Sequence, residues 1–268
     1  MPFIDIHGKN TYYQQNGELR TDKSTIVFVH GAGGTGSKWE HQLSGIEGYN
    51  LIALDLPGHG RSEGETADSI IIYREFVWEF VQALELGSFV IVGHSMGGAI
   101  AMEFALAYPD LLEGLIIVDS GARLRVNPET LEVLSQGKHP LGNVKYSYSQ
   151  KASLAVLERA AEEMKTVPTG VLLADFRACD SFNLMDRVQS INLPVLILCG
   201  QDDQMTPVKY SEYLSKQLVH STFVLIPDAG HTAMIEQSEP VNRAIKDFMD
   251  TRPEQSDPDS TTNLGRER

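Results

Sequence analysis

A series of short, β-branched apolar runs most constrains the fold of this chain. STIVFVH (24–30) and SFVIVGH (88–94) are continuous apolar runs, the pattern of strands that are covered on both faces. Similar runs lie at 49–55, 112–120, 193–200 and 221–227. Helical segments alternate with these runs through short loops, which is typical of a doubly wound sheet. We therefore predict an α/β fold with a mostly parallel sheet, preceded by two edge strands within residues 3–18.

One of the helices between strands is predicted by the segment IIIYREFVWEFVQALEL (70–86). Helical spacing places several of its apolar side chains on a common face, which we expect to pack against the sheet. These side chains are Ile72, Phe76, Phe80 and Ala83.

The alternation of strands and helices is interrupted between residues 122 and 190. This stretch holds several helical patterns with no strand-like run between them. Because a structureless loop of this length is uncommon in a compact domain, we predict a helical cap inserted between two strands. The expected parts are a first core segment at 1–121, the cap at 122–190, a second core segment at 191–250 and a tail at 251–268. The tail is polar and rich in Ser, Thr and Pro, and we predict it to be disordered.

Composition and charge exclude several classes of protein. A chain of 268 residues with 42% hydrophobic residues can bury the core of one large α/β domain. Its net charge of −14 would repel nucleic acid and anionic membranes, so neither is an expected partner. No apolar stretch approaches the ~18 residues of a membrane span, and no leader-like run opens the chain. We expect a soluble protein without membrane insertion, and the sequence does not specify its oligomeric state.

The two cysteines, Cys179 and Cys199, are too few for a disulfide framework and cannot form a zinc site alone. Cys199 lies in an apolar run, where a cysteine is most simply a small buried hydrophobic residue. Isolated cysteines of this kind fit a reducing compartment, so we expect a cytoplasmic protein. No metal or organic cofactor is implied.

The stretch VIVGHSMGGAIAME (91–104) begins as a strand and ends as a helix, with Ser95 between the two halves. Gly93 and Gly97 lie two residues to either side, which gives the pattern G-x-S-x-G. A serine in such a turn projects above the C-terminal edge of the sheet, and its neighbours must be small because the strand and helix backbones meet there. Ser95 is therefore the candidate nucleophile. The alternative is a helix N-cap serine flanked by glycines that only serve packing.

A serine hydroxyl needs a base to remove its proton, and His231 is the favoured histidine. It follows the last strand-like run, in a loop with Gly230, and so belongs to the sheet edge that carries Ser95. The other histidines fit less well. His94 adjoins the serine but is expected to point away, and His30 ends a buried strand. We interpret them as structural or solvated side chains.

The base in turn needs a carboxylate that holds its tautomer and stabilises the imidazolium. Asp203 follows the penultimate strand, in a loop that should lie beside the loop of His231. We favour Asp203 for this role. Its neighbour Asp202 and the strand-end Asp119 are the alternatives, with a loop cap and a strand-end turn as their structural interpretations.

The loop His30-Gly31-Ala32-Gly33-Gly34 follows the first long strand and could supply N–H groups to a developing oxyanion. The expected donors are the N–H groups of Ala32 and Met96, with Gly33 as the alternative to Ala32. A phosphate-binding role is disfavoured, because GAGGTGSK has neither the G-x-x-x-x-G-K-[ST] spacing nor the G-x-G-x-x-G spacing.

These pieces closely resemble the α/β-hydrolase superfamily. The motifs, in that family's order, are HGAGG (30–34), DLPGHGRS (55–62), GHSMGG (93–98), GQDDQMTP (200–207) and AGH (229–231). The resemblance covers nearly the whole chain apart from the tail, and the cap matches only in position and helical character. It implies that the first motif is the oxyanion loop and that the last three carry nucleophile, acid and base. It also implies that Asp55, His59 and Arg61 brace loops.

The main functional prediction is a serine hydrolase of the carboxylesterase type, acting on small to medium carboxylic esters through an acyl-enzyme on Ser95. Serine at this position sets aside the family's haloalkane dehalogenases and epoxide hydrolases, which carry aspartate there. The substrate is expected to be a small molecule. Its expected contacts are Gly31, Gly33, Trp39, Met205 and Met234.

Other activities fit the same three residues. One is a hydrolase of carbon–carbon bonds in ring-fission products, in which Arg123, Arg125 or Arg177 would hold a substrate carboxylate. A cofactor-free perhydrolase is another. A hypothesis of a different class is a ligand receptor that uses the cap as a lid and hydrolyses its ligand only slowly.

Overall fold

The structure is a computed structural model that describes residues 2–252. The last helix, α9 (Ser238–Thr251), runs to the first residue of the predicted tail. The rest of the segment predicted to be disordered lies, from residue 253 on, outside the described residues.

An 8-stranded sheet forms the centre of the molecule, in the order β1-β2-β4-β3-β5-β6-β7-β8. The strands are β1 (Phe3–Ile6), β2 (Lys9–Gln15), β3 (Thr25–Val29), β4 (Asn50–Leu54), β5 (Phe89–His94), β6 (Leu112–Val118), β7 (Val195–Gly200) and β8 (Ser221–Ile226). From β4 to β8 neighbouring strands run parallel, and β1 and β2 pair antiparallel. The predicted doubly wound α/β fold is thereby confirmed. Of the two predicted edge strands only β1 lies at the edge, because β2 also pairs with β4.

Successive residues of the central strands point into two separate hydrophobic cores. In β3, Val27 and Val29 belong to one core, and Ile26 and Phe28 belong to the other. This is the period of two that a pleated strand imposes, and it explains why the central strands are apolar at every position.

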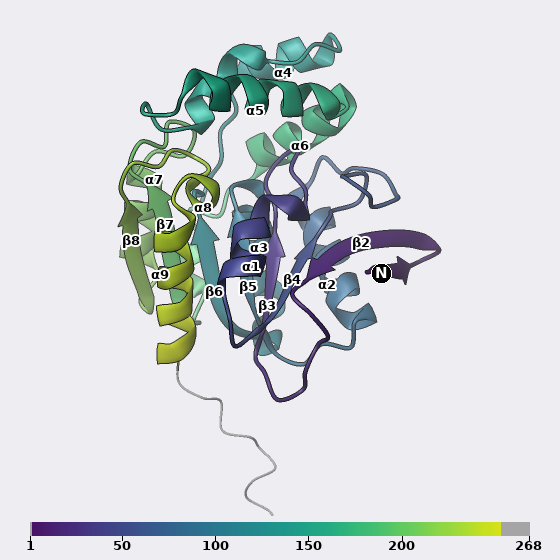
Figure 1. The fold of residues 1–268 in the computed structure, drawn as a ribbon, viewed down its shortest axis with the longest axis vertical. Helices are drawn as coiled ribbons and strands as arrows, with labels where there is room; N and C mark the ends of the chain where they lie inside the picture. Colours follow the sequence, from purple (N-terminus) through teal and green to yellow (C-terminus); the bar gives the residue numbers. More distant parts are fainter. Residues whose placement is uncertain (1, 253–268) are drawn as a thin grey trace, which may run out of the picture.

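Helices cover both faces of the sheet (Figure 1). One core is closed by α2 (Ile70–Ala83), α3 (Met96–Ala107) and α7 (Lys209–Gln217). The opposite core is closed by α1 (Glu40–Gly45), α8 (Ala233–Glu236) and α9. The helix α3 begins directly after Ser95, so the packing of α3 against the sheet determines where this serine lies.

Between β6 and β7 the chain forms α4 (Pro128–Ser135), the 3-10 helix η3 (Leu141–Ser147), α5 (Leu154–Thr166) and α6 (Thr169–Ser181). We call these four the cap helices. They lie beyond the C-terminal ends of the parallel strands, at the top of Figure 1. The two passages of the chain that connect them to the sheet lie side by side, because Leu184 N–H donates to Ala122 O at 2.7 Å and Arg123 bridges Asn183.

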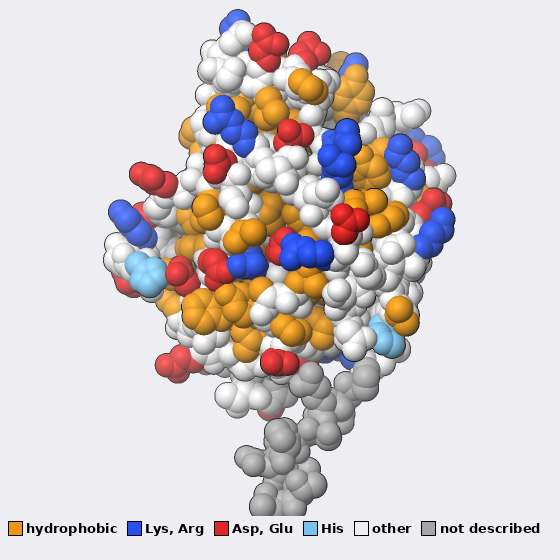
Figure 2. All heavy atoms as spheres, turned by 180° about the vertical axis from the view of Figure 1, so that it is seen from behind, with side chains coloured by type: hydrophobic (Ala, Val, Ile, Leu, Met, Phe, Trp, Pro, Cys, Tyr) orange, Lys and Arg blue, Asp and Glu red, His pale blue; other side chains and the backbone are white. Residues whose placement is uncertain are grey.

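The surface in Figure 2 carries acidic and basic side chains interspersed around apolar ones, with no continuous basic area on that face. Such a mixture lacks the single-sign basic patch of nucleic-acid-binding surfaces. Within residues 2–252, no helix has both the length and the apolarity that crossing a bilayer requires.

Candidate active site

Ser95 occupies a strained turn between β5 and α3. Its backbone has φ 53° and ψ −115°, a left-handed φ that non-glycine residues seldom adopt. A Cβ on Gly93 would lie 2.1 Å from Gly97 O, and a Cβ on Gly97 would lie 2.3 Å from Val29 O. The two glycines are therefore required by the close approach of strand and helix. Ser120 holds the turn from outside, since its hydroxyl donates to Ser95 O at 2.7 Å.

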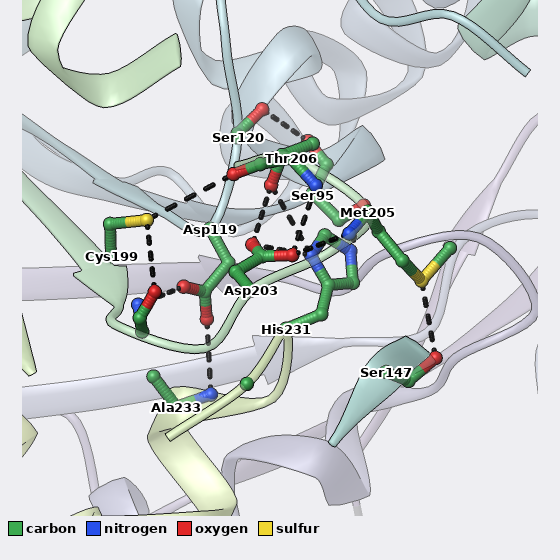
Figure 3. Close-up of polar contacts among 12 residues, drawn as sticks. Ser95, Asp119, Ser120, Ser147, Cys199, Asp203, Met205, Thr206, His231 and Ala233 are labelled. Carbon is green, nitrogen blue, oxygen red and sulfur yellow. Dashed lines mark hydrogen bonds and ion pairs between the residues drawn. The ribbon is translucent and has the colours of Figure 1, made fainter. Parts of the chain in front are cut away.

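Three side chains from separate loops form one line of hydrogen bonds (Figure 3). The Ser95 Oγ lies 2.8 Å from His231 Nε2, and His231 Nδ1 lies 2.9 Å from Asp203 Oδ2. Ser95 follows β5, Asp203 follows β7 and His231 follows β8. These parallel strands end at the same edge of the sheet, which brings together residues that are far apart in the sequence.

The groups around this line of hydrogen bonds make His231 more basic and keep Asp203 ionised. Burial disfavours the imidazolium, but the Asp203 carboxylate outweighs burial and raises the pKa of His231 above its ordinary 6.5. Burial also opposes ionisation of Asp203, yet the charge of His231 and hydrogen bonds from Thr206 lower the pKa of this carboxyl to about 2. The Met205 and Thr206 amides donate to its Oδ1 at 2.8 and 2.9 Å. Asp203 is therefore an ionised acceptor for His231.

The two alternative carboxylates make other contacts. Asp119 accepts the Gly200 and Ala233 amides at 2.7 and 3.0 Å, so it joins the end of β7 to the start of α8. Burial, and then the charge of Asp203, raise the pKa of Asp119 to about 7. Asp202 accepts the hydroxyl of Ser149 at 2.6 Å. Neither carboxylate has a hydrogen bond to His231 among residues 2–252.

His94, beside the serine in sequence, supports the loop of His231. Its Nε2 lies 2.6 Å from the backbone oxygen of His231. Burial, and then the positive charge of His231, lower the pKa of His94 to about 3, so its imidazole is neutral and donates to that oxygen.

In the loop after β3, two of the N–H groups near the site are already paired. Gly34 N–H donates to Gly31 O at 3.0 Å, and Gly33 N–H donates to Asp175 Oδ2 at 2.7 Å. The alternative oxyanion donor, Gly33, is thus already occupied. Among the described residues, the N–H groups of Ala32 and Met96 have no hydrogen-bond acceptor. Their assignment as the oxyanion donors stays a prediction that this arrangement favours.

A cavity of about 670 Å³ opens over Ser95 and His231. The cap helices close it from one side, for example through Met164 of α5 and Leu172 of α6. Four of the predicted substrate contacts line it, namely Gly31, Gly33, Met205 and Met234. A mostly apolar cavity of this size with a few convergent polar groups is the usual form of a small-molecule site.

Trp39, the fifth predicted substrate contact, does not line this cavity. Its side chain is completely buried and packs on the Phe28 ring at 5.0 Å between centroids. It ends the short 3-10 helix η1 (Gly36–Trp39) and belongs to the core under α1 and α8. The prediction for Trp39 was wrong because the tryptophan serves packing.

Asp119, Cys199 and Asp203 form a buried cluster whose ligand atoms lie within 4.8 Å of one another. Three such groups could in principle hold a metal ion. Here the carboxylate oxygens accept N–H and O–H groups of the surrounding loops, and burial raises the pKa of the Cys199 thiol. The donor set is that of a hydrogen-bonded network in which the sulfur stays protonated.

Sequence reasoning missed two residues of the site. Thr206 donates its hydroxyl to Asp203 Oδ2 at 2.7 Å and lies 3.2 Å from His231 Nδ1. A hydroxyl residue three positions after a loop aspartate is a local signal that could have identified it. Asp175 reaches the predicted oxyanion loop from the cap, 142 residues away from Gly33, and no local pattern indicates that contact.

Comparison with known proteins agrees with the fold. The chain matches the alpha/beta hydrolase fold family over residues 24–238 and belongs to that family. Its structure is similar to that of a thermophilic esterase, with a TM-score of 0.81, 32% identity, and coverage of 92% of this chain and 96% of the esterase.

Two curated relatives extend this comparison. The putative carbamate hydrolase RutD of Pseudomonas syringae pv. syringae (strain B728a) is 26% identical over 87% of this chain and 96% of its own. The (E)-2-((N-methylformamido)methylene)succinate hydrolase of Acinetobacter baylyi (strain ATCC 33305 / BD413 / ADP1) is 26% identical over 92% of this chain and 97% of its own. The predicted family and the prediction of a hydrolase are thereby confirmed.

Proposed function

We propose that this protein is a serine hydrolase that cleaves small to medium carboxylic esters through an acyl-enzyme on Ser95. The observation that carries the proposal is the continuous line from Ser95 through His231 to Asp203, which opens into a cavity of about 670 Å³. The similarity to a thermophilic esterase at 32% identity supports the ester as the scissile group.

In the first half of the reaction, Ser95 Oγ attacks the acyl carbon while its proton passes to His231 Nε2, 2.8 Å away. The carbonyl electrons move onto oxygen, and the N–H groups of Ala32 and Met96 stabilise this oxyanion. Asp203 stabilises the imidazolium. The tetrahedral intermediate then collapses, the carbon–oxygen bond to the alcohol breaks, and His231 gives its proton to the departing alcohol.

In the second half, His231 removes a proton from a water molecule as that water attacks the acyl carbon. The same donors hold the second oxyanion. Collapse breaks the bond to Ser95 Oγ, which recovers its proton from His231, and the carboxylic acid leaves. The enzyme returns to its starting protonation state, and no electrons are gained or lost.

A second candidate is hydrolysis of a carbon–carbon bond in a substrate that carries a carboxylate. Arg125 favours this candidate because its side chain lines the cavity and has no carboxylate partner within residues 2–252. A named succinate hydrolase among the relatives also points to an acidic substrate. Arg123 lines only a second cavity of about 290 Å³, which Arg125 lines as well, and Arg177 lines neither cavity.

The test compares the wild type with Ser95→Ala on p-nitrophenyl esters of increasing acyl length and on a ring-fission dienoate. We expect ester turnover in the wild type and roughly a millionfold lower kcat in Ser95→Ala, the scale found when a serine nucleophile is removed. Ser37→Ala is the matched control, because Ser37 lines the same cavity without contacting His231.

Three results would overturn the ester proposal. Full ester hydrolysis by Ser95→Ala would remove Ser95 from the mechanism. Turnover of the dienoate without any ester turnover would establish the carbon–carbon hydrolase. A burst that stalls after about one turnover would indicate a ligand receptor, since release and not chemistry would then limit the protein.

A further inference from the structure

One fully buried carboxylate of the cap helices reaches the oxyanion loop. Asp175, on α6, accepts Gly33 N–H at 2.7 Å and lies 2.8 Å from His59 Nε2, both through its Oδ2. Its Oδ1 accepts the Tyr73 hydroxyl at 2.6 Å. Asp175, His59 and Tyr73 are each at most 2% exposed. We call Asp175, His59 and Tyr73 the Asp175 cluster. The reaction steps above use none of its members.

The same helix also presses on the loop sterically. Gly33 has a φ of +62°, and a Cβ there would lie 2.4 Å from Leu172 Cδ2. Leu172 precedes Asp175 by three positions, so the two side chains share one face of α6. Gly33 is thus held by a hydrogen bond and a van der Waals contact that both come from the cap helices.

These contacts fix the orientation of the peptide units around Ala32. The Gly31–Ala32 peptide carries the predicted oxyanion donor, and its carbonyl oxygen accepts Gly34 N–H at 3.0 Å. Because a peptide unit is planar, holding that carbonyl also directs the Ala32 N–H. The adjoining Ala32–Gly33 peptide is held by Asp175 through its N–H. Asp175 therefore restrains the backbone next to the Ala32 N–H by holding the Gly33 N–H, while the Gly34 N–H holds the Gly31 carbonyl.

The charge of His59 favours the contact with Asp175 when the cap is docked. His59 Nδ1 lies 3.0 Å from Pro57 O while Nε2 faces Asp175, so only the doubly protonated ring can donate at both nitrogens. Burial disfavours this charge, but Asp175 outweighs burial and raises the pKa of His59. The other groups near the ring are Asp55, the Tyr73 hydroxyl and the neutral, fully buried His30, whose pKa burial lowers.

We propose that Asp175 is a positioning residue that sets the oxyanion loop through the Gly33 amide, so that docking of the cap helices completes the oxyanion site at Ala32. The inference rests on the proposed serine mechanism and adds a condition to it. A cap that moves away takes its carboxylate along and leaves Gly33 unanchored. The same movement of the cap helices would then enclose the substrate and complete the site that stabilises the oxyanion.

The test compares Asp175→Asn with Asp180→Asn. Asp180 lies on the same helix and also accepts a backbone amide, that of Val126 at 3.1 Å, but it has no hydrogen bond to the Gly31–Gly34 loop among the described residues. In Asp175→Asn an NH2 group replaces one carboxylate oxygen and faces a donor. We expect kcat on p-nitrophenyl butyrate to fall about 100-fold with little change in KM, the scale of an ångström-sized misplacement at a reacting centre. Asp180→Asn should stay within about twofold of the wild type.

Labelling of Ser95 by a fluorophosphonate gives a second measurement that needs no ester turnover, because its phosphoryl oxygen takes the place of the oxyanion. We expect Asp175→Asn to be labelled about 100-fold more slowly than the wild type. Equal rates for wild type, Asp175→Asn and Asp180→Asn would overturn the inference. A wild type that is labelled but hydrolyses no ester would instead contradict the proposed function and leave the labelling comparison valid.

If Asp175→Asn does not fold, amide exchange in the wild-type protein decides. We expect the Gly33 amide, which donates to a buried carboxylate, to exchange more slowly than the Ala32 amide, which has no acceptor. Equally fast exchange of both amides would overturn the inference. Tyr73→Phe, which removes one hydrogen bond to Asp175 and leaves the Gly33 bond, should lower kcat by less than Asp175→Asn does.

Discussion

The helix that begins after Ser95 and the helix above the cavity are built in opposite ways. In α3 every residue from 96 to 105 is buried, whereas α5 buries none and leaves Leu154 70% exposed. A helix that is apolar all round is locked inside a core, and an amphipathic one is held on a single face. The position of Ser95 is therefore determined by many contacts, and the cap side of the cavity by few.

Within the cap helices, α6 is the exception. It buries Leu172, Asp175, Ala178 and Cys179, and it is the helix that contacts the oxyanion loop. Elements with few buried contacts open at low free-energy cost, so α5 should open more readily than α6. The comparison between core and cap can be tested at single residues.

Between core and cap, the largest expected difference is that between two neighbouring carboxylates, Asp203 in the core site and Asp202 beside the cap region. Asp203→Asn should lower kcat by about 10⁴, since an asparagine holds the wrong tautomer of the base. Asp202→Asn, whose carboxylate hydrogen-bonds Ser149 of the cap region and no other side chain within residues 2–252, should leave kcat within about tenfold. Steady-state kinetics on p-nitrophenyl butyrate measure both. The contrast collapses if the two variants lose activity equally.

Asp119→Asn adds a third arm to that experiment. Its amide can accept only one of the two N–H groups that Asp119 now accepts, so we expect a loss of stability of about 1–3 kcal/mol with kcat within tenfold of the wild type. Greater loss of kcat in Asp119→Asn than in Asp203→Asn would assign the acid role to Asp119.

Large-to-small substitutions test the two helices directly. Phe104→Ala in α3 should reduce the free energy of unfolding by about 3–5 kcal/mol, because a fully buried ring leaves a cavity. Leu154→Ala in α5 should change it by less than about 0.5 kcal/mol, because the side chain is mostly in water. Urea unfolding followed by circular dichroism measures both. A comparable loss in the two variants would show that α5 is covered in solution.

The core site was predictable because its signals are local. A strand, a serine between glycines and a helix specify the turn at Ser95 from adjacent residues. The positions of Asp203 and His231 followed from one general fact, that parallel strands end at a common edge. His231 lies 2.8 Å from Ser95 and 2.9 Å from Asp203, which agrees with the predicted line of nucleophile, base and acid. The catalytic roles of the three residues are the subject of the kinetic tests.

Contacts between distant segments were not predictable. The helix at 70–86 was expected to bury Ile72, but Ile72 is 56% exposed and Tyr73 is buried in its place. Three consecutive isoleucines leave the helical phase ambiguous, and the buried Tyr73 hydroxyl is paired because it donates to Asp175 and accepts the Ala67 N–H. Nothing in the sequence around Asp175 encodes that partner, since it depends on how α6 packs on the sheet.

We expect the pH dependence of activity to be determined by residues of the core and not by residues of the cap helices. His231 must be neutral to act as the base, so kcat/KM should fall about tenfold per pH unit below a pKa that lies above the ordinary 6.5. The carboxylates that raise it are Asp203, Asp119 and Glu236, all outside the cap helices. Glu163→Gln in α5 should therefore leave this acidic limb in place. A shift of the acidic limb of the pH profile in Glu163→Gln would show that the cap helices also influence the pKa of His231.

The contribution of His231 to stability depends on pH in the direction opposite to its contribution to activity. A folded-state pKa raised above the unfolded value means that protonated His231 stabilises the fold below about pH 6.5. That contribution is lost as pH rises through the folded-state pKa, where activity appears.

The smallest expected effect concerns two glycines of the cap region with open space around them. Gly170→Ala, in α6, should raise the free energy of unfolding by about 0.4–1 kcal/mol, because the unfolded chain has less conformational entropy with alanine than with glycine. Gly137 has equal room but a φ of +70°, so Gly137→Ala should be destabilising. Thermal melts measure the signs. Equal signs would mean that backbone conformation does not control stability here.

The paired entry and exit of the cap have a practical consequence for engineering. Ala122 and Leu184 are joined by a backbone hydrogen bond of 2.7 Å, so a foreign insertion joined at these two points needs no linker. Such a graft would keep the serine, histidine and aspartate of the host. It would function only if it also placed an acceptor opposite the Gly33 amide. If the proposed role of Asp175 holds, a transplanted cap must also carry a buried carboxylate that accepts the Gly33 N–H.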